Sequence, residues 1–277
     1  MSLTLDEKER LRTREYTRAE VMVVAGAREM RDHEIILAGV GLPQVSAVVA
    51  RYTHAPRLRI LLELGIVEPS PIHSAIGLSD PRIWYGCTCM TGWLDVMGMA
   101  LHRGMLDLGF LSGIQVDQYG NINTTLLGTY QRPLKYFQGT GGGANDIASL
   151  AKRLIIIMKH EKRRFPERVD YITSPGHLDG PSGRSKVGLR PGGPSKVITD
   201  LAVLDFDEET RRMRLLTLHP NVSLDDVKEN TGFELIVPKR VSVTPPPTAR
   251  EQEVIRTIAD ENGEFTGWKR AKEATDS

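Results

Sequence analysis

The stretch LIIIM at residues 154–158 decides the fold more directly than any other part of this sequence. Five apolar residues without a polar break are typical of a strand that is covered on both faces of a sheet. The residues before it, 147–153, predict a helix. A second short apolar run, LRILL at residues 58–62, predicts another buried strand, which stops at Glu63-Leu64-Gly65.

The same alternation of strand, glycine turn and helix extends outward from both runs. It predicts an α/β fold with an open, largely parallel sheet flanked by helices. We expect one domain over residues 1–277, with flexible tails at 1–14 and 268–277. The further predicted segments are helices at 17–30, with Thr17 as N-cap, 44–51 and 93–104, strands at 34–37 and 106–114, a long surface loop at 176–194, and a hairpin of 197–206 with 213–218 joined by a charged turn at 207–212.

Composition excludes several function classes. Hydrophobic residues make up 40% of the 277 residues, enough for a sizeable core. The 36 Lys and Arg residues balance 35 Asp and Glu residues, so the net charge does not favour binding to nucleic acid or to a membrane surface. No apolar run approaches the roughly 18 residues of a membrane helix. Two cysteines and no histidine ligand motif indicate neither a disulfide framework nor a metal site. The mixed-charge N-terminus differs from a signal peptide, and we expect the cytoplasm.

Glu63 is the first candidate for chemistry. It closes an apolar strand and precedes a glycine, so its carboxylate can project into the crevice where α/β sheets bind ligands. A carboxylate partly shielded from water is a better nucleophile than a fully hydrated one. The alternative is an acidic residue in a solvated turn, and Glu68 meets the same description less well.

Two further segments could stabilise developing charge. The segment GTGGGAND at residues 139–146 lets backbone N–H groups approach an anion, although an ordinary flexible turn has the same composition. Asn123, in DQYGNIN at 117–123, has a side-chain amide that could hold an oxyanion, although turn chemistry alone explains this segment.

Other polar clusters carry less specific signals. The basic cluster HEKRR at residues 160–164 follows the buried strand and could bind phosphates of a nucleotide-like ligand, or be a solvated helix start. Cys87 and Cys89 are free cysteines, which are more often small buried hydrophobes than nucleophiles.

In their order along nearly the whole chain, these segments resemble the B (beta) subunit of family I coenzyme A (CoA) transferases of the glutaconate type. The matching stretches are Gly41-Leu42-Pro43, Glu63 with Gly65, Ser70-Pro71, residues 115–117 and 119–123, the glycine segment ending Ala144-Asn145, HEKRRF at 160–165, DYITSPG at 170–176, Asp179-Gly180-Pro181, Asp226-Val227 and ENTGF at 229–233.

The resemblance implies a three-layer α/β fold, a different A (alpha) subunit as partner in a heterodimer or larger assembly, and CoA as a substrate with no permanently bound cofactor. It also implies that Glu63 attacks an acyl-CoA and then carries CoA as a glutamyl-CoA thioester, which passes to a carboxylic acid. Asn123 and the backbone amides of Gly141, Gly142 and Gly143 are the implied oxyanion donors.

Two departures from the family pattern keep other reactions open. The family commonly has Ser or Asn between the glutamate and the glycine, where this chain has Leu64, and the glycine run is one residue longer than expected. The alternatives are an acyl-CoA hydrolase, a C–C bond hydrolase or a decarboxylase on the same fold, and a non-catalytic subunit that shapes its partner's site.

Overall fold

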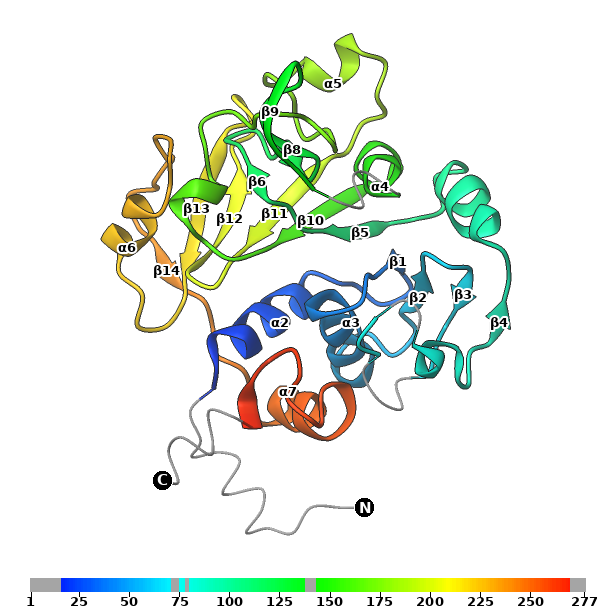
Figure 1. Ribbon diagram of the computed structural model, residues 1–277. Helices are drawn as coiled ribbons and strands as arrows, with labels where there is room; N and C mark the ends of the chain where they lie inside the picture. Colours follow the sequence, from blue (N-terminus) through cyan, green and yellow to red (C-terminus); the bar gives the residue numbers. More distant parts are fainter. Residues whose placement is uncertain (1–15, 71–74, 78–79, 138–142, 270–277) are drawn as a thin grey trace.

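A computed structural model describes residues 16–70, 75–77, 80–137 and 143–269. A ten-stranded sheet runs through the molecule, with helices on both faces (Figure 1). Within these residues, no helix has the length and hydropathy needed to cross a membrane.

The sheet has the strand order β14-β13-β12-β11-β10-β5-β1-β2-β3-β4. Its five central strands, from β11 to β2, are all parallel, which confirms the predicted architecture. The strands on either side turn back in antiparallel hairpins, so the sheet is mixed overall. The strands are β1 (Ile35–Leu37), β2 (Arg59–Leu62), β3 (Ile66–Val67), β4 (Cys89–Met90), β5 (Leu108–Leu111), β10 (Arg153–Ile157), β11 (Pro194–Ile198), β12 (Ala202–Phe206), β13 (Met213–Leu218) and β14 (Ser242–Val243).

The hairpin between β12 and β13 forms around residues 207–212 as predicted. The prediction of one strand over 197–206 is wrong, because the chain reverses at residues 199–201 and pairs β11 with β12. The side chain of Thr199 stabilises this reversal. Its Oγ1 donates to Ala202 O and accepts from the N–H groups of Leu201 and Ala202.

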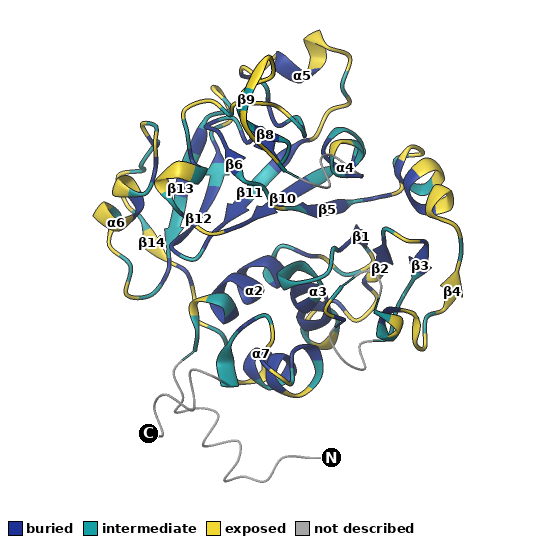
Figure 2. Ribbon diagram, viewed as in Figure 1, coloured by how far each residue is buried: buried dark blue, intermediate teal, exposed yellow. Residues whose placement is uncertain are grey.

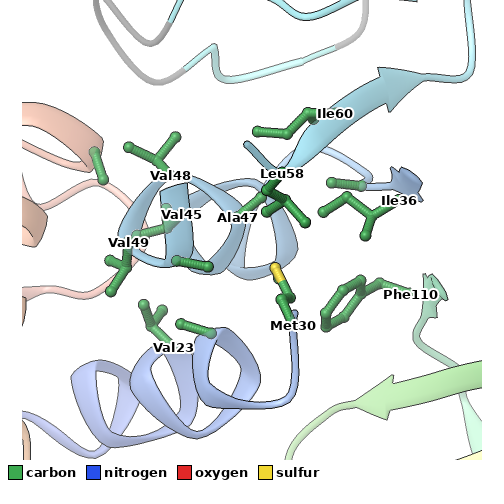
Figure 3. Close-up of a cluster of buried hydrophobic side chains, with 14 of the residues drawn as sticks. Val23, Met30, Ile36, Val45, Ala47, Val48, Val49, Leu58, Ile60 and Phe110 are labelled. Atoms are coloured by element: carbon green, nitrogen blue, oxygen red, sulfur yellow. The ribbon is translucent and has the colours of Figure 1, made fainter. Parts of the chain in front are cut away.

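Successive residues of the central strands point to opposite faces, and both faces are covered. Ile155 and Ile157 of β10 pack into the cluster under α2 and α3, while Leu154 and Ile156 pack into the cluster on the other face. Figure 3 shows the first cluster between α2 and α3. Burial on both sides explains why this strand has an unbroken apolar run. The helices are α2 (Arg18–Arg28), α3 (Leu42–Thr53), η1 (Pro81–Trp84), η2 (a π-helix, Leu94–Leu101), α4 (Ala144–Leu150), η3 (Lys162–Arg164), α5 (Gly183–Lys186), α6 (Leu224–Glu229), α7 (Ala249–Val254) and η4 (Ile255–Ala259).

Two small hairpins lie on the same side of the large sheet as α4: β6 (Gln115–Val116) with β7 (Ile122–Asn123), and β8 (Leu126–Thr129) with β9 (Arg132–Tyr136) (Figure 1). The predicted surface loop at 176–194 is only partly a loop. It contains the short helix α5, and its residues His177 and Arg184 are buried. Arg184 donates to the carbonyls of Gly176 and Ala148, which ties the segment to α4.

The predicted helix start at Thr17 is confirmed by a reciprocal capping box with Glu20. Of the predicted flexible tails, 1–14 and 268–277, residues 1–14 and 270–277 lie outside the described residues. Trp268 and Lys269 differ from the prediction: the indole of Trp268 donates to Asp260 O at 2.7 Å and packs against the core.

Candidate active site

Glu63 lies at the first position of the three-residue turn that joins β2 to β3. Gly65 closes this turn with a φ of +94°, a conformation that other residues rarely adopt. A side chain at position 65 would overlap the carbonyl of Thr91, so the turn is held tightly against the segment that precedes η2. The residues that resemble a family motif, Glu63 and Gly65, are therefore a nucleophile candidate and the glycine that fixes its turn.

A cavity of about 830 Å³ opens at the carboxyl ends of the parallel strands. Glu63 lines it together with residues at or just beyond the ends of the neighbouring strands, Leu37 of β1, Leu111 of β5 and Met158 after β10. This is the position where open α/β sheets bind their ligands. The cavity has the size of a small-molecule site.

The carboxylate of Glu63 faces Gly143. A Cβ built on Gly143 would lie 3.4 Å from Glu63 Oε1 and would overlap Met97 of η2. Glu63 is half-buried, and its carboxylate has neither a hydrogen-bond nor an ion-pair partner among the described residues. A carboxylate held in a cavity without such partners keeps its lone pairs available for attack on a bound electrophile.

Of the three predicted glycine donors, the structure describes Gly143. Gly141 and Gly142 lie outside the described residues. Gly143 precedes α4 directly and lines the cavity. The glycine segment therefore runs into a helix, as the sequence predicts, but the helix begins at Ala144 and not at residue 147.

Asn123 is engaged within the fold in this structure. It is fully buried in β7 and does not line the cavity. Its amide nitrogen donates to Gln115 Oε1 and Leu126 O, both at 2.7 Å, and its Oδ1 accepts from the N–H groups of Thr125 and Leu126. Both amide hydrogens are used within the fold, so Asn123 has no hydrogen left to donate to an oxyanion.

The rest of the DQYGNIN segment is also a hydrogen-bonded turn. Asp117 accepts from the backbone of Tyr119 and from the side chain of Asn121, and Asn121 in turn binds the backbone of Gly176 and Leu178. Burial raises the pKa of Asp117, although these hydrogen bonds act in the opposite direction. The turn chemistry that the sequence offered as an alternative explains this segment.

The other polar candidates lie away from the cavity. Glu68 accepts from Thr88 Oγ1 at 3.2 Å and lies 3.9 Å from Arg59. Cys87 packs beside the core, and Cys89 is exposed in the edge strand β4. Among the described residues, no three His, Cys, Asp or Glu side chains are grouped closely enough to hold a metal ion.

Sequence reasoning missed three charged residues of the cavity. Arg18 begins α2, Lys159 follows β10 and Asp200 follows β11. Their place just after a buried strand is the signal that could have found Lys159 and Asp200. Arg164, from the predicted basic cluster, also lines the cavity.

Known proteins resemble this chain in sequence and in fold. The sequence model of the family described as Coenzyme A transferase matches residues 19–230. The B subunit of glutaconate CoA-transferase from Acidaminococcus fermentans is 40% identical over 89% of this chain and 92% of its own length. The B subunit of 3-oxoadipate CoA-transferase from Pseudomonas knackmussii is 34% identical over 88% of this chain and 93% of its own.

A more distant relative has another activity in its name. The cholesterol ring-cleaving hydrolase IpdB subunit of Mycobacterium tuberculosis is 31% identical over 88% of this chain and 95% of its own length. Among solved structures, that of glutaconate CoA-transferase from A. fermentans superimposes with a TM-score of 0.84 at 37% identity, covering 91% of this chain and 99% of that one.

Proposed function

Since this chain belongs to the coenzyme A transferase family, as a B-type subunit, we propose that it transfers CoA from an acyl-CoA to a carboxylic acid with Glu63 as the nucleophile. The observation that carries this proposal is the half-buried carboxylate of Glu63, which lines the cavity beside Gly143. The greater identity to two transferase subunits than to the hydrolase favours transfer over hydrolysis.

The reaction proceeds in two halves. In the first, a carboxylate oxygen of Glu63 attacks the thioester carbonyl, the C–S bond breaks, and CoA leaves as a thiolate with a mixed anhydride left behind. The thiolate then attacks the glutamyl carbonyl of this anhydride. The donor acid leaves as a carboxylate, and CoA is held on Glu63 as a thioester.

The second half repeats these steps in reverse with another acid. The acceptor carboxylate attacks the glutamyl thioester, and the thiolate that leaves attacks the acceptor's carbonyl in the new anhydride. Glu63 is released as a carboxylate, and no proton is gained or lost over the cycle. Transfer requires that water be kept from Glu63 in the assembled complex, since water would hydrolyse both the anhydride and the thioester.

Each addition places negative charge on a carbonyl oxygen, which must be stabilised by donors set in advance. The removal of one such donor typically costs about 10²- to 10³-fold in rate. We assign this role to backbone amides within Gly141, Gly142 and Gly143, of which Gly143 is supported by its position beside the carboxylate. Asn123 is left out of the proposal, because its amide is engaged within the fold.

The active enzyme contains a second, A-type subunit, as the names of the two transferase relatives imply. We propose that CoA enters as a substrate and that the assembled complex is the form that turns over. The acid that donates and the acid that accepts CoA depend on lining residues from both subunits.

Mass spectrometry of the complex tests the covalent step. The chain is co-purified with its A-type partner and incubated with a set of acyl-CoAs without an acceptor. We expect a CoA-sized adduct on the peptide that carries Glu63, and no adduct after Glu63→Gln. The exchange rate of Glu63→Gln should fall by at least about 10³-fold.

Glu68→Gln is the matched control, because Glu68 is a carboxylate in the same region that lies outside the cavity. Its exchange rate should be unchanged. Consumption of an acyl-CoA without an acceptor and without an adduct would replace this proposal with a hydrolase.

A further inference from the structure

The cavity that contains Glu63 has a cationic end. Arg18, Lys159 and Arg164 line it, and the only acidic group that lines it besides Glu63 is Asp200, among the residues described. Helix α2, which begins with Arg18, packs against β10 and β11, the strands that end just before Lys159 and Asp200. These charged groups therefore gather at the β10–β11 part of the sheet edge.

The cations are not all neutralised by their surroundings. Asp200 accepts a hydrogen bond from the backbone N–H of His160 at 2.7 Å, which holds it close to the end of β10. Arg164 is partly committed, since it donates to Gly113 O and lies 3.3 Å from Glu161. Lys159 is exposed and has no hydrogen-bond or ion-pair partner in the part of the chain that the structure describes. A surplus of positive charge in a cavity favours an anionic ligand group.

The strand order gives the separation between this end and the nucleophile. Glu63 follows β2 and Lys159 follows β10, and the sheet runs β2-β1-β5-β10. Three steps between adjacent strands correspond to roughly 14–15 Å. A dicarboxylic acid of about five or six carbons spans only about half of this spacing between strand ends, so a longer ligand fits it better.

The pantetheine arm of CoA has the right length. About twelve bonds separate its sulfur from the first phosphate ester oxygen, and at about 3.8 Å per three bonds this arm extends to roughly 15 Å. With the sulfur at the Glu63 carboxylate, the phosphates would reach the β10–β11 part of the edge.

We propose that Lys159, together with Arg18 and Arg164, binds the phosphate groups of CoA while its thioester lies at Glu63. This assignment rests on the proposed transferase function. It orients bound CoA with its sulfur at Glu63 and its phosphates at the β10–β11 part of the sheet edge. The sequence cluster at 160–164, which follows a buried strand, contributes Arg164 to it.

Equilibrium binding tests the proposal without requiring turnover. Calorimetry on the complex with its A-type partner, carrying Glu63→Gln to prevent acylation, compares CoA with pantetheine, which lacks the phosphates. Loss of one charge-assisted contact should raise the Kd for CoA by about 10-fold after Lys159→Ala. The Kd for pantetheine should stay unchanged, and Lys159→Arg should restore most of the CoA affinity.

Lys228→Ala is the matched control, because Lys228 is an exposed lysine on α6 outside the cavity, and it should bind both ligands as before. An equal loss for CoA and pantetheine, or no loss for CoA, would overturn the proposal. A loss confined to a free dicarboxylic acid would also overturn it and assign Lys159 to the acid substrate. A missing Glu63 adduct with CoA binding intact would instead contradict the covalent step and leave this assignment standing.

Discussion

At the scale of single residues, Met97 occupies the space that a side chain at position 143 would need. We predict that Gly143→Ala lowers the exchange rate by about 10- to 100-fold, because the new methyl group must displace the end of the Met97 side chain at a point 3.4 Å from Glu63 Oε1. Overpacking of this kind typically costs about 1–3 kcal/mol of unfolding free energy. Steady-state exchange and urea unfolding measure the two effects.

The double variant Gly143→Ala/Met97→Ala tests whether the lost rate is due to steric overlap with Met97. It should recover part of the lost rate, since it removes the atoms that the new methyl group overlaps. Gly39→Ala is the control, because Gly39 lines the same cavity and a Cβ there meets nothing within 4 Å. Full activity in Gly143→Ala would show that Gly143 is not constrained by its neighbours.

Residue identity predicted the candidate site in part. Glu63 could be found because a lone carboxylate after an apolar strand falls at the ligand-binding edge of a parallel sheet. The structure uses the amide of Asn123 to hold a hairpin, and the local sequence does not distinguish such an amide from one that faces a ligand. Lys159 was overlooked although it follows a buried strand, and the strand order brings the end of that strand, β10, to the same cavity as Glu63.

At the scale of elements, a buried ion pair joins the first described helix to the last. Arg256 of η4 lies 2.8 Å from Glu20 of α2, and both side chains are almost fully buried. We predict that Arg256→Ala lowers the unfolding free energy by about 3–5 kcal/mol, because Glu20 is left as a buried charge without this partner. Arg250→Ala should cause no measurable change, since the Arg250–Glu253 pair is exposed. Similar unfolding midpoints in urea for both variants would contradict this.

Buried histidines should make the packing of elements sensitive to acid. His160 follows β10, bonds Thr199 and Thr231 at 3.0 Å and stacks on Phe165. Burial, with a smaller effect from His219, lowers the pKa of His160 to about 4, although Asp200 acts in the opposite direction. Burial likewise lowers the pKa of His177 to about 4.

The sign of the effect follows from proton binding. The unfolded chain takes up a proton near pH 6.5 while the folded chain does so near pH 4, so stability falls as the pH drops between these values. Each histidine should cost roughly 2 kcal/mol between about pH 7 and pH 5. Between the same pH values, the unfolding free energy of His160→Gln, measured in urea, should fall by about 2 kcal/mol less than that of the wild type. A variant with the wild-type pH dependence would exclude His160 as a cause.

The elements were predicted best where periodicity and capping agree. The capping box at Thr17 marks a helix start, and the apolar run of strand β10 marks a strand buried on both faces. The helix at 93–104 was predicted, but its π-helical form between Leu94 and Leu101 was not, because the apolar pattern does not distinguish the two hydrogen-bonding schemes. The reversal at Thr199 was missed because one threonine makes the turn in an otherwise β-rich run.

At the scale of the whole molecule, the largest exposed apolar side chains include a group beside the nucleophile's turn. We define the η2 patch as Leu64, Met90, Trp93, Leu94 and Met99, which are between 38% and 67% exposed. The residues that hold Gly65 in place, Thr91 and Gly92, lie within this stretch. Figure 2 shows β4 and the neighbouring η2 as a largely exposed end of the molecule. Several large apolar side chains exposed in one segment favour an interaction site.

We predict that the A-type partner covers the η2 patch. Leu94→Glu should weaken co-purification of the two subunits by at least about 30-fold in Kd, because a buried charge at the centre of an apolar contact is strongly unfavourable. Val243→Glu is the matched control: Val243 is 59% exposed on β14, at the opposite edge of the sheet, and should assemble normally. Because Thr91 and Gly92, just before Leu94, hold the Glu63 turn, residual Leu94→Glu complex should also exchange CoA more slowly. Normal assembly of Leu94→Glu, with assembly lost in Val243→Glu, would move the interface to the other edge of the sheet and remove the partner from the nucleophile's neighbourhood.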